Sequence, residues 1–268
     1  MLYLGAAALA LLGPSRPRLW PLLLLGHAAL LGLIMRRPRP DLRVAWDWYP
    51  LLLMPLLYAE IPLLNQCWGG GYRDGAILAL ERAAFGGQPA RSLAAAFPSQ
   101  ALSELLHFCY LSYYGLIFAP LLPLYLRGRR PEFARTLLAV MIAFYLCYLC
   151  FIYYPVEGPR YLWPAPKAVP QGPLRSLADR ILALGSSRGA AFPSAHMAIA
   201  SAQSLMALRL QPIGFAPLIL LTFGLGLGAI YGGYHYAVDI LAGAFMGVVA
   251  VRLTDLLTGR HSMADRDT

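Results

Sequence analysis

The sequence predicts an all-α protein: a polytopic bundle of membrane-spanning helices, with a six-helix core and one or two helices before it. Two observations predict this fold class. The chain of 268 residues is 59% hydrophobic and only 13% charged, whereas a soluble domain is about half apolar and about a quarter charged. Its apolar residues also gather in stretches close to the roughly 20 residues that a helix needs to cross a bilayer.

Apolar stretches of suitable length follow one another along the chain. The expected spans are residues 19–35, 48–64, 102–126, 134–154, 192–208, 213–231 and 236–257. Residues 1–13 are apolar but short. We expect them to form an eighth, poorly spanning helix, a half-buried helix or the apolar part of a signal peptide. The signal peptide is the least favoured of these, since no basic segment precedes the stretch.

The spans imply a simple domain organisation. We expect one or two N-terminal membrane helices in residues 1–45, a single transmembrane domain in residues 46–257 and a flexible tail in residues 258–268. Within the domain, residues 173–186 carry apolar side chains at helical spacing, which predicts an amphipathic helix in the membrane interface. Small-residue stripes predict close helix packing; their glycines are Gly224, Gly228, Gly232, Gly243 and Gly247.

Arginines predict the orientation of the bundle. They gather in residues 36–43 and 127–135 and flank the last span at Arg252 and Arg260, and such loops usually stay cytoplasmic. Three loops are then expected on the opposite face, although arginines also occur in the second of them: 65–101, 155–191 and 232–235. We therefore expect an integral protein of a bacterial inner membrane with these loops facing the periplasm or exterior.

The net charge of +9 is interpreted as membrane orientation and phosphate binding. The basic residues form no stripe with interleaved aromatic residues, so no nucleic acid partner is expected. Cys147 and Cys150 lie inside an apolar span and are expected to be buried small side chains. The acidic residues form no cluster suited to magnesium. The sequence thus predicts no metal and no cofactor.

A histidine and an aspartate at the start of the last span indicate catalytic chemistry. His235 and Asp239 are four residues apart, so at the start of a helix they share one face. A carboxylate there can accept the Nδ1 proton, which fixes the imidazole tautomer and leaves Nε2 free to attack an electrophile. The alternative interpretation is a purely structural hydrogen bond.

The segment Pro193-Ser194-Ala195-His196 predicts a helix start that can bind an anion. Pro193 suits the first turn of a helix. The amides of Ser194 and Ala195 would then point out from its positive end, with the Ser194 hydroxyl as a further donor. His196 is expected in that turn, on the same membrane face as His235. The alternative is an ordinary helix start with an interfacial histidine.

Arg160 follows the span at residues 134–154 and is expected on that same face. Its guanidinium is always charged and presents a fork that matches phosphate oxygens. An arginine that faces lipid headgroups is the alternative interpretation. Each of the three segments is weak evidence alone, but together they bring a cation, a helix-start histidine and a His–Asp pair to one membrane face.

In combination, these segments resemble the three motifs of the type 2 phosphatidic acid phosphatase superfamily. Arg160 matches the arginine of the first motif, Pro193-Ser194-Ala195-His196 matches the second with Ala195 replacing glycine, and His235 and Asp239 match the third. The resemblance covers residues 134–257 closely and 48–257 loosely. It implies a membrane enzyme, a phosphatase or phosphotransferase, whose substrate is a lipid phosphoester.

The chain departs from the family pattern at two phosphate-binding cations. Tyr153 stands where the first motif has lysine, and Ala229 stands where the third has arginine; Tyr161 also replaces a proline. A branch similar to inositol phosphorylceramide and sphingomyelin synthases lacks the same arginine. The chain looks closest to this inositolphosphotransferase-like branch.

The resemblance implies a two-step mechanism. His235, oriented by Asp239, would attack phosphorus and form a phosphohistidine, while His196 protonates the departing oxygen and later activates the acceptor. Arg160, Ser194 and Ala195 are expected to bind the phosphate, with Arg188 and Lys167 replacing the missing cations.

A phosphodiester-type transfer to a hydroxylated acceptor is favoured, because a diester carries one negative charge and needs fewer cations. The first alternative is a lipid phosphomonoester phosphatase of the phosphatidic acid or polyprenyl phosphate type, with water as acceptor. A membrane transporter and a catalytically inactive scaffold are the alternatives from other functional classes.

Overall fold

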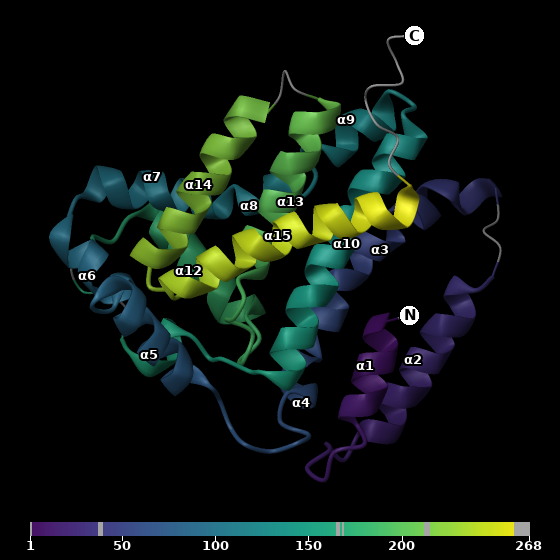
Figure 1. Ribbon diagram of the computed structural model, residues 1–268, viewed down its shortest axis with the longest axis horizontal. Coiled ribbons are helices and arrows are strands. Elements are labelled where there is room, and N and C mark those ends of the chain that lie inside the picture. Colours follow the sequence, from purple (N-terminus) through teal and green to yellow (C-terminus); the bar gives the residue numbers. More distant parts are fainter. Residues whose placement is uncertain (1, 37–39, 165–166, 168, 212–214, 260–268) are drawn as a thin grey trace.

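The structure is a computed structural model that describes residues 2–36, 40–164, 167, 169–211 and 215–259. Every regular element in these ranges is a helix (Figure 1), and the strand-like pairing found there is one isolated bridge between Val156 and Ala190. The all-α fold predicted from the sequence is confirmed. Arg37, Arg39, Arg260 and most of the expected tail lie outside the described residues.

Three helical stretches among the described residues are long and apolar enough to cross a membrane: Gln100–Leu126, Arg130–Tyr153 and Ala237–Thr258. The first is interrupted and consists of α7 (Gln100–Leu111), α8 (Tyr113–Leu116) and α9 (Leu121–Leu126); the others are α10 and α15. The remaining expected spans are shorter helices: α2 (Trp20–Ile34), α3 (Arg43–Ala59) with α4 (Ile61–Leu64), α13 (Ala195–Leu210) and α14 (Phe215–Tyr231).

Helix α10 lies at the centre of the bundle and packs against α13, α15, α3, α9 and α1. Its sequence is apolar around most of its circumference, which is the pattern of a helix surrounded by other helices. Its buried side chains include Val140, Phe144, Tyr148 and Phe151, which form one core with residues of the neighbouring helices. This core sets the relative positions of α10, α13 and α15.

Backbone contacts at glycines hold α13 to α15 and α14 to α7. A Cβ on Gly243 of α15 would overlap the Ser194 carbonyl, and one on Gly228 of α14 would overlap the Leu106 carbonyl. Small residues at such crossings let membrane helices approach closely. The first contact places the start of α13 directly against the first turns of α15.

Helices outside the long spans gather at the end of the bundle where α15 begins (Figure 1). Residues 173–185 form α12 (Pro173–Gly185), so the expected helix is present. The 65–101 segment is not a plain loop, because it contains α5 (Asp74–Phe85) and α6 (Pro89–Ala96). A single turn, α11 (Pro159–Leu162), follows α10.

The N-terminal helices form a hairpin at one edge of the bundle (Figure 1). Helix α1 (Leu2–Ala10) has nine residues, too few to cross a bilayer core of about 30 Å, and it packs against α10. Ala7 and Ala10 are completely buried, which favours a short packed helix among the interpretations of residues 1–13. The side chains of Tyr3 and His27 meet Glu60, which lies at the break between α3 and α4.

Candidate active site

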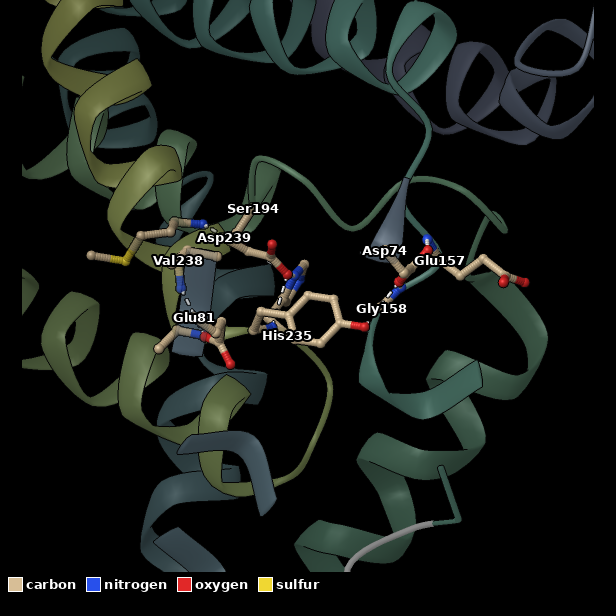
Figure 2. Close-up of polar contacts among 11 residues, drawn as sticks. Asp74, Glu81, Glu157, Gly158, Ser194, His235, Val238 and Asp239 are labelled. Atoms are coloured by element: carbon tan, nitrogen blue, oxygen red, sulfur yellow. Dashed lines mark hydrogen bonds and ion pairs between the residues drawn. The ribbon is translucent and has the colours of Figure 1, made fainter. Parts of the chain in front are cut away.

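His235 and Asp239 form the expected pair where α15 begins. His235 lies in the turn after α14, and Asp239 lies in the first turn of α15. The His235 Nδ1 and Asp239 Oδ2 atoms are 3.3 Å apart, and the same oxygen accepts the Tyr236 amide at 2.8 Å. Only 6% of His235 and none of Asp239 is exposed. The imidazole is therefore held from its Nδ1 side (Figure 2).

Helix α13 begins at Ala195, two residues after Pro193. Ser194 is the N-cap residue, and its Oγ accepts from the Met197 amide at 3.4 Å, as serine commonly does at helix starts. The expectation that Pro193 occupies the first turn is wrong, because the serine side chain takes the capping position one residue later. The Ser194 amide donates to the Asp239 carbonyl at 3.0 Å, so it is not the free phosphate donor that the sequence suggested.

The Ser194 hydroxyl and the His196 ring both lie close to His235. The Oγ atom is 3.4 Å from His235 Nε2. The two imidazole rings have centroids 5.9 Å apart and are nearly perpendicular. Tyr113 approaches the His196 ring edge-on with centroids 4.3 Å apart. Both histidines thus border one space, and each ring has its own neighbouring side chains.

That space is a cavity of about 510 Å³. Its polar lining includes His196, His235, Arg160, Glu157, Ser186 and Ser187. The rest of the lining is mainly tyrosines and apolar side chains, among them Tyr58, Tyr110, Tyr113, Tyr114, Leu51, Met54 and Phe144. Leu52 and Phe118 line it as well and are exposed on the apolar surface. The cavity therefore joins a polar, histidine-bearing end to the side of the molecule that faces lipid.

Arg160 is fixed in the wall of this cavity. Its Nη1 atom donates to the Ser186 hydroxyl at 2.9 Å and to the Leu182 carbonyl at 3.2 Å. Its guanidinium also lies over the Tyr161 ring, 5.2 Å from the centroid. Because α12 supplies the Leu182 carbonyl and ends just before Ser186, this amphipathic helix sets the position of the arginine.

The other two expected cations do not line the histidine cavity. Arg188 pairs with Glu157 and has 57% of its side chain exposed. Lys167 lines a second cavity of about 520 Å³, together with Arg91, Trp163 and Asp179. Arg160, Leu182 and Tyr234 line both cavities. Along the part of the chain that the structure describes, Arg160 is the one cationic side chain that borders the histidine cavity.

A family model described as the PAP2 superfamily matches residues 75–253, two thirds of the chain. The chain belongs to the PAP2 superfamily. Members of this superfamily are phosphatases and phosphotransferases, so the chain is an enzyme of phosphoester chemistry at the level of the family. With its long apolar helices, it is an integral membrane protein. No curated protein and no solved structure matches it.

Helix α5, which lies within the PAP2 match except for Asp74, carries two buried carboxylates that sequence reasoning missed. The two Asp74 oxygens accept from the amides of Glu157 and Gly158, each at 2.9 Å, and Oδ1 also accepts from the Tyr236 hydroxyl at 2.9 Å. Glu81 Oε1 accepts from the amides of Ala237 and Val238. Both acids thus contact segments that contain the family motifs (Figure 2).

A signal for these carboxylates is present in the sequence. Asp74 and Glu81 are seven residues apart, two helical turns, with Ile77 on the same buried face of α5. Acidic residues are almost never fully buried unless they are paired. Acids on the apolar face of a helix beside a catalytic span therefore indicate hydrogen bonds to a neighbouring segment.

Burial controls the charge state of the PAP2 histidine at position 235. The pKa of His235 is lowered to about 4: removal from solvent is the largest cause, a backbone hydrogen bond at Ala191 opposes the shift, and the nearby Arg160 charge adds to it. An imidazole with this pKa is neutral at pH 7 and keeps a lone pair on one nitrogen. Burial also raises the pKa of Glu81, against the effect of the Ala237 and Val238 amides.

Proposed function

We propose that this PAP2 enzyme transfers a phosphoryl-bearing group from a lipid phosphodiester to a hydroxylated acceptor through a phosphohistidine at His235. The observation that carries the proposal is the pair of histidines at one cavity, which Arg160 also lines, with His235 held by Asp239. A nucleophile that is held by a third group is the general signature of covalent catalysis.

In the first step, the neutral His235 Nε2 attacks phosphorus, and a P–N bond forms as the P–O bond to the leaving group breaks. At this step His196 must carry a proton, which it gives to the departing oxygen. The positive charge that develops on the His235 ring is stabilised by Asp239 at Nδ1, 3.3 Å away. Arg160 and the Ser194 hydroxyl are assigned to the phosphoryl oxygens, because positioned donors stabilise the charge that develops there.

In the second step, the acceptor hydroxyl attacks phosphorus and the P–N bond breaks. His196, now neutral, takes the hydroxyl proton and returns to its starting state. His235 regains its lone pair. The cycle balances without a metal or a redox partner: His196 gives one proton to the leaving group and takes one from the acceptor, and His235 forms and then loses the bond to phosphorus.

A phosphodiester is favoured over a monoester by the cations at the cavity. The two positions where the family pattern has further cations carry Tyr153 and Ala229. The Tyr153 hydroxyl donates to the Ala6 carbonyl in α1 at 2.8 Å, and Ala229 is fully buried. Arg160 alone is better matched to the single charge of a diester than to the two charges of a monoester.

The second cavity supports a separate place for a polar acceptor. It contains Arg91, Lys167 and Asp179 and shares Arg160 and Tyr234 with the histidine cavity. Hydroxyl groups and anions are bound by such mixtures of charged side chains. The first cavity, with its long apolar wall, suits the lipid donor. This division favours the inositolphosphotransferase-like branch over a phosphatase that uses water.

The test is a transfer assay with purified protein in lipid nanodiscs. We expect a phospholipid donor and a panel of polyols to give a new lipid phosphodiester in the wild-type protein and none in His235→Ala. Release of inorganic phosphate from a lipid monophosphate, with no transfer to any polyol, would instead establish the phosphatase alternative. Arg91→Ala and Lys167→Ala should raise the KM for the acceptor and leave that for the donor unchanged.

A further inference from the structure

The start of α15 has more amide donors than its own residues satisfy. The first amides of any helix lack partners within the helix. Here the Tyr236 amide donates to Asp239 Oδ2, whereas the Ala237 and Val238 amides donate to Glu81 Oε1 on α5. The Asp239 amide donates to the Tyr236 carbonyl at 3.2 Å. Two carboxylates from distant parts of the chain thus share one helix start.

The sharing of these amides between Asp239 and Glu81 matters because the Asp239 carboxylate also contacts His235. Its Oδ2 atom is 2.8 Å from the Tyr236 amide and 3.3 Å from His235 Nδ1. An acidic residue in the first turn is attracted to the free amides of its own helix. If Ala237 and Val238 had no other acceptor, the Asp239 side chain would be drawn toward them and away from the imidazole.

Glu81 is positioned to prevent this movement. It is fully buried, and a buried carboxylate is costly unless it is hydrogen-bonded. It reaches α15 across 156 residues of sequence, from a helix that Asp74 attaches to the same segment through the Tyr236 hydroxyl at 2.9 Å. Figure 2 shows Glu81 at the Val238 amide and Asp239 at His235, on different sides of the same turn.

We propose that Glu81 is a positioning residue of this enzyme: it caps α15 from outside the helix and thereby leaves the Asp239 carboxylate on His235. The inference rests on the proposed roles of His235 and Asp239. Glu81 itself touches neither the cavity nor the imidazole in any described contact, so it acts through Asp239.

A double-mutant cycle tests the inference. Glu81→Ala, Asp239→Ala and the double variant are compared by kcat and KM for the lipid donor. We expect Glu81→Ala to lower kcat by roughly 10–100-fold with little change in KM, the usual effect of removing a group that orients a catalytic residue. In the Asp239→Ala background the same change should cost less than about twofold, because residues that act as a unit are not additive.

Two further variants separate positioning from general stability. Glu81→Gln keeps a carbonyl oxygen for the two amides and should recover most of kcat. Arg82→Ala, at the exposed neighbour on the same helix, should leave kcat and the melting temperature unchanged. Equal losses from Glu81→Ala with and without Asp239 would overturn the inference. If Glu81→Ala does not fold, Glu81→Asp replaces it in the cycle, because it withdraws the oxygen by one methylene and keeps the charge.

A readout without turnover separates this inference from the proposed function. ¹⁵N NMR of histidine-labelled protein reports which ring nitrogen of His235 carries the proton. Wild type and Glu81→Gln should show a protonated Nδ1, and Glu81→Ala should show a mixture of tautomers. A mixture in Glu81→Ala, with no transfer activity in wild type, would sustain the positioning role and reject the transferase. An unchanged Nδ1 proton in Glu81→Ala would reject the positioning role whatever the activity.

Discussion

His235 and His196 border the same cavity but have different partners. A buried carboxylate holds His235 at Nδ1, whereas tyrosine rings surround His196. An imidazole that is held at one nitrogen presents the other in a fixed direction, as a nucleophile requires. The proposed mechanism assigns the proton transfers to His196. The residue-scale predictions follow from this difference.

Replacement of His235 by alanine should abolish transfer. We expect kcat to fall by at least roughly 10³-fold, since removal of a nucleophile that acts in a unit with its partners eliminates most of the rate enhancement. The measurement is product formation from a radiolabelled lipid donor, with circular dichroism and the melting temperature as controls for folding. Turnover comparable to that of the parent would end the phosphohistidine mechanism.

The acidic limb of the rate profile should lie at low pH. The His235 imidazole is neutral above its pKa and is protonated, hence not nucleophilic, below it. Because this pKa is lowered to about 4, mainly by burial, the limb of kcat/KM that reports loss of the His235 nucleophile should lie near pH 4, rather than near the ordinary histidine value of about 6.5.

The pH prediction has an internal control. The Arg160 charge contributes to the lowered pKa of His235, so Arg160→Gln should move the acidic limb to higher pH as well as reduce the rate. Measurement of kcat/KM reports the free enzyme. A limb near 6.5 in both proteins would show that a group other than His235 controls the reaction.

Ala229 cannot be converted into the family's arginine without cost. Its side chain is fully buried and packs in one cluster with Tyr110 and Tyr234. We expect Ala229→Arg to lower the melting temperature because a buried, unpaired charge is among the most destabilising changes. A well-folded variant that gains monoester hydrolysis would show that the missing cation alone determines substrate preference.

At the scale of helices, the crossing of α13 and α15 is fixed by contact between backbones. Gly243→Ala places a methyl group against the Ser194 carbonyl, so the two helices must separate. We expect a loss of about 1–3 kcal/mol in stability, typical of overpacking, and a lower kcat because Ser194 and His196 move away from His235.

Gly26→Ala is the matched control for this helix prediction. Gly26 also lies in a helix, α2, but nothing stands within 4 Å of the position of an added Cβ. Chemical denaturation and kcat should therefore be unchanged or slightly improved in the control. Similar behaviour of the two variants would mean that the α13–α15 crossing tolerates adjustment.

The helices were predicted well where hydrophobic periodicity decides structure and poorly where tertiary contacts do. The apolar stretches became helices, and residues 173–185 became α12. Hydrophobic periodicity did not predict α5 in residues 65–101, because the buried face of this helix includes Asp74 and Glu81. These buried carboxylates are stabilised by amides that are far away in the sequence. Lengths were also overestimated, since Ser112 and Glu60 interrupt two apolar stretches.

The types and spacing of residues predicted which side chains form the site. They did not predict which hydrogen-bond donors are already bound to other parts of the protein. Four-residue spacing placed His235 and Asp239 together. The amide of Ser194 was expected to be free, yet it donates to Asp239. Arg188 was expected to face phosphate, yet it pairs with Glu157. These partners come from other elements, so only the folded chain reveals them.

The whole molecule has a polar end with its site and an opposite end with basic loops. We expect the polar end to face the periplasm, as the arginines of residues 127–135 predict. In a variant without its natural cysteines, Ala84→Cys on α5 should react with a membrane-impermeant maleimide in intact cells. Arg127→Cys, just after α9, should react only after permeabilisation. The reverse pattern would invert the orientation.

The residues that line both cavities have a consequence for the kinetics of transfer. In a double displacement through one pocket, each substrate can occupy the form of the enzyme that awaits the other, and high acceptor concentration inhibits. Arg160, Leu182 and Tyr234 divide the space instead. If the lipid and the acceptor each bind in their own cavity, the acceptor can stay bound while the group displaced from the lipid donor leaves, and a high acceptor concentration should not inhibit. The apolar and the polar substrate would then not compete for one binding site.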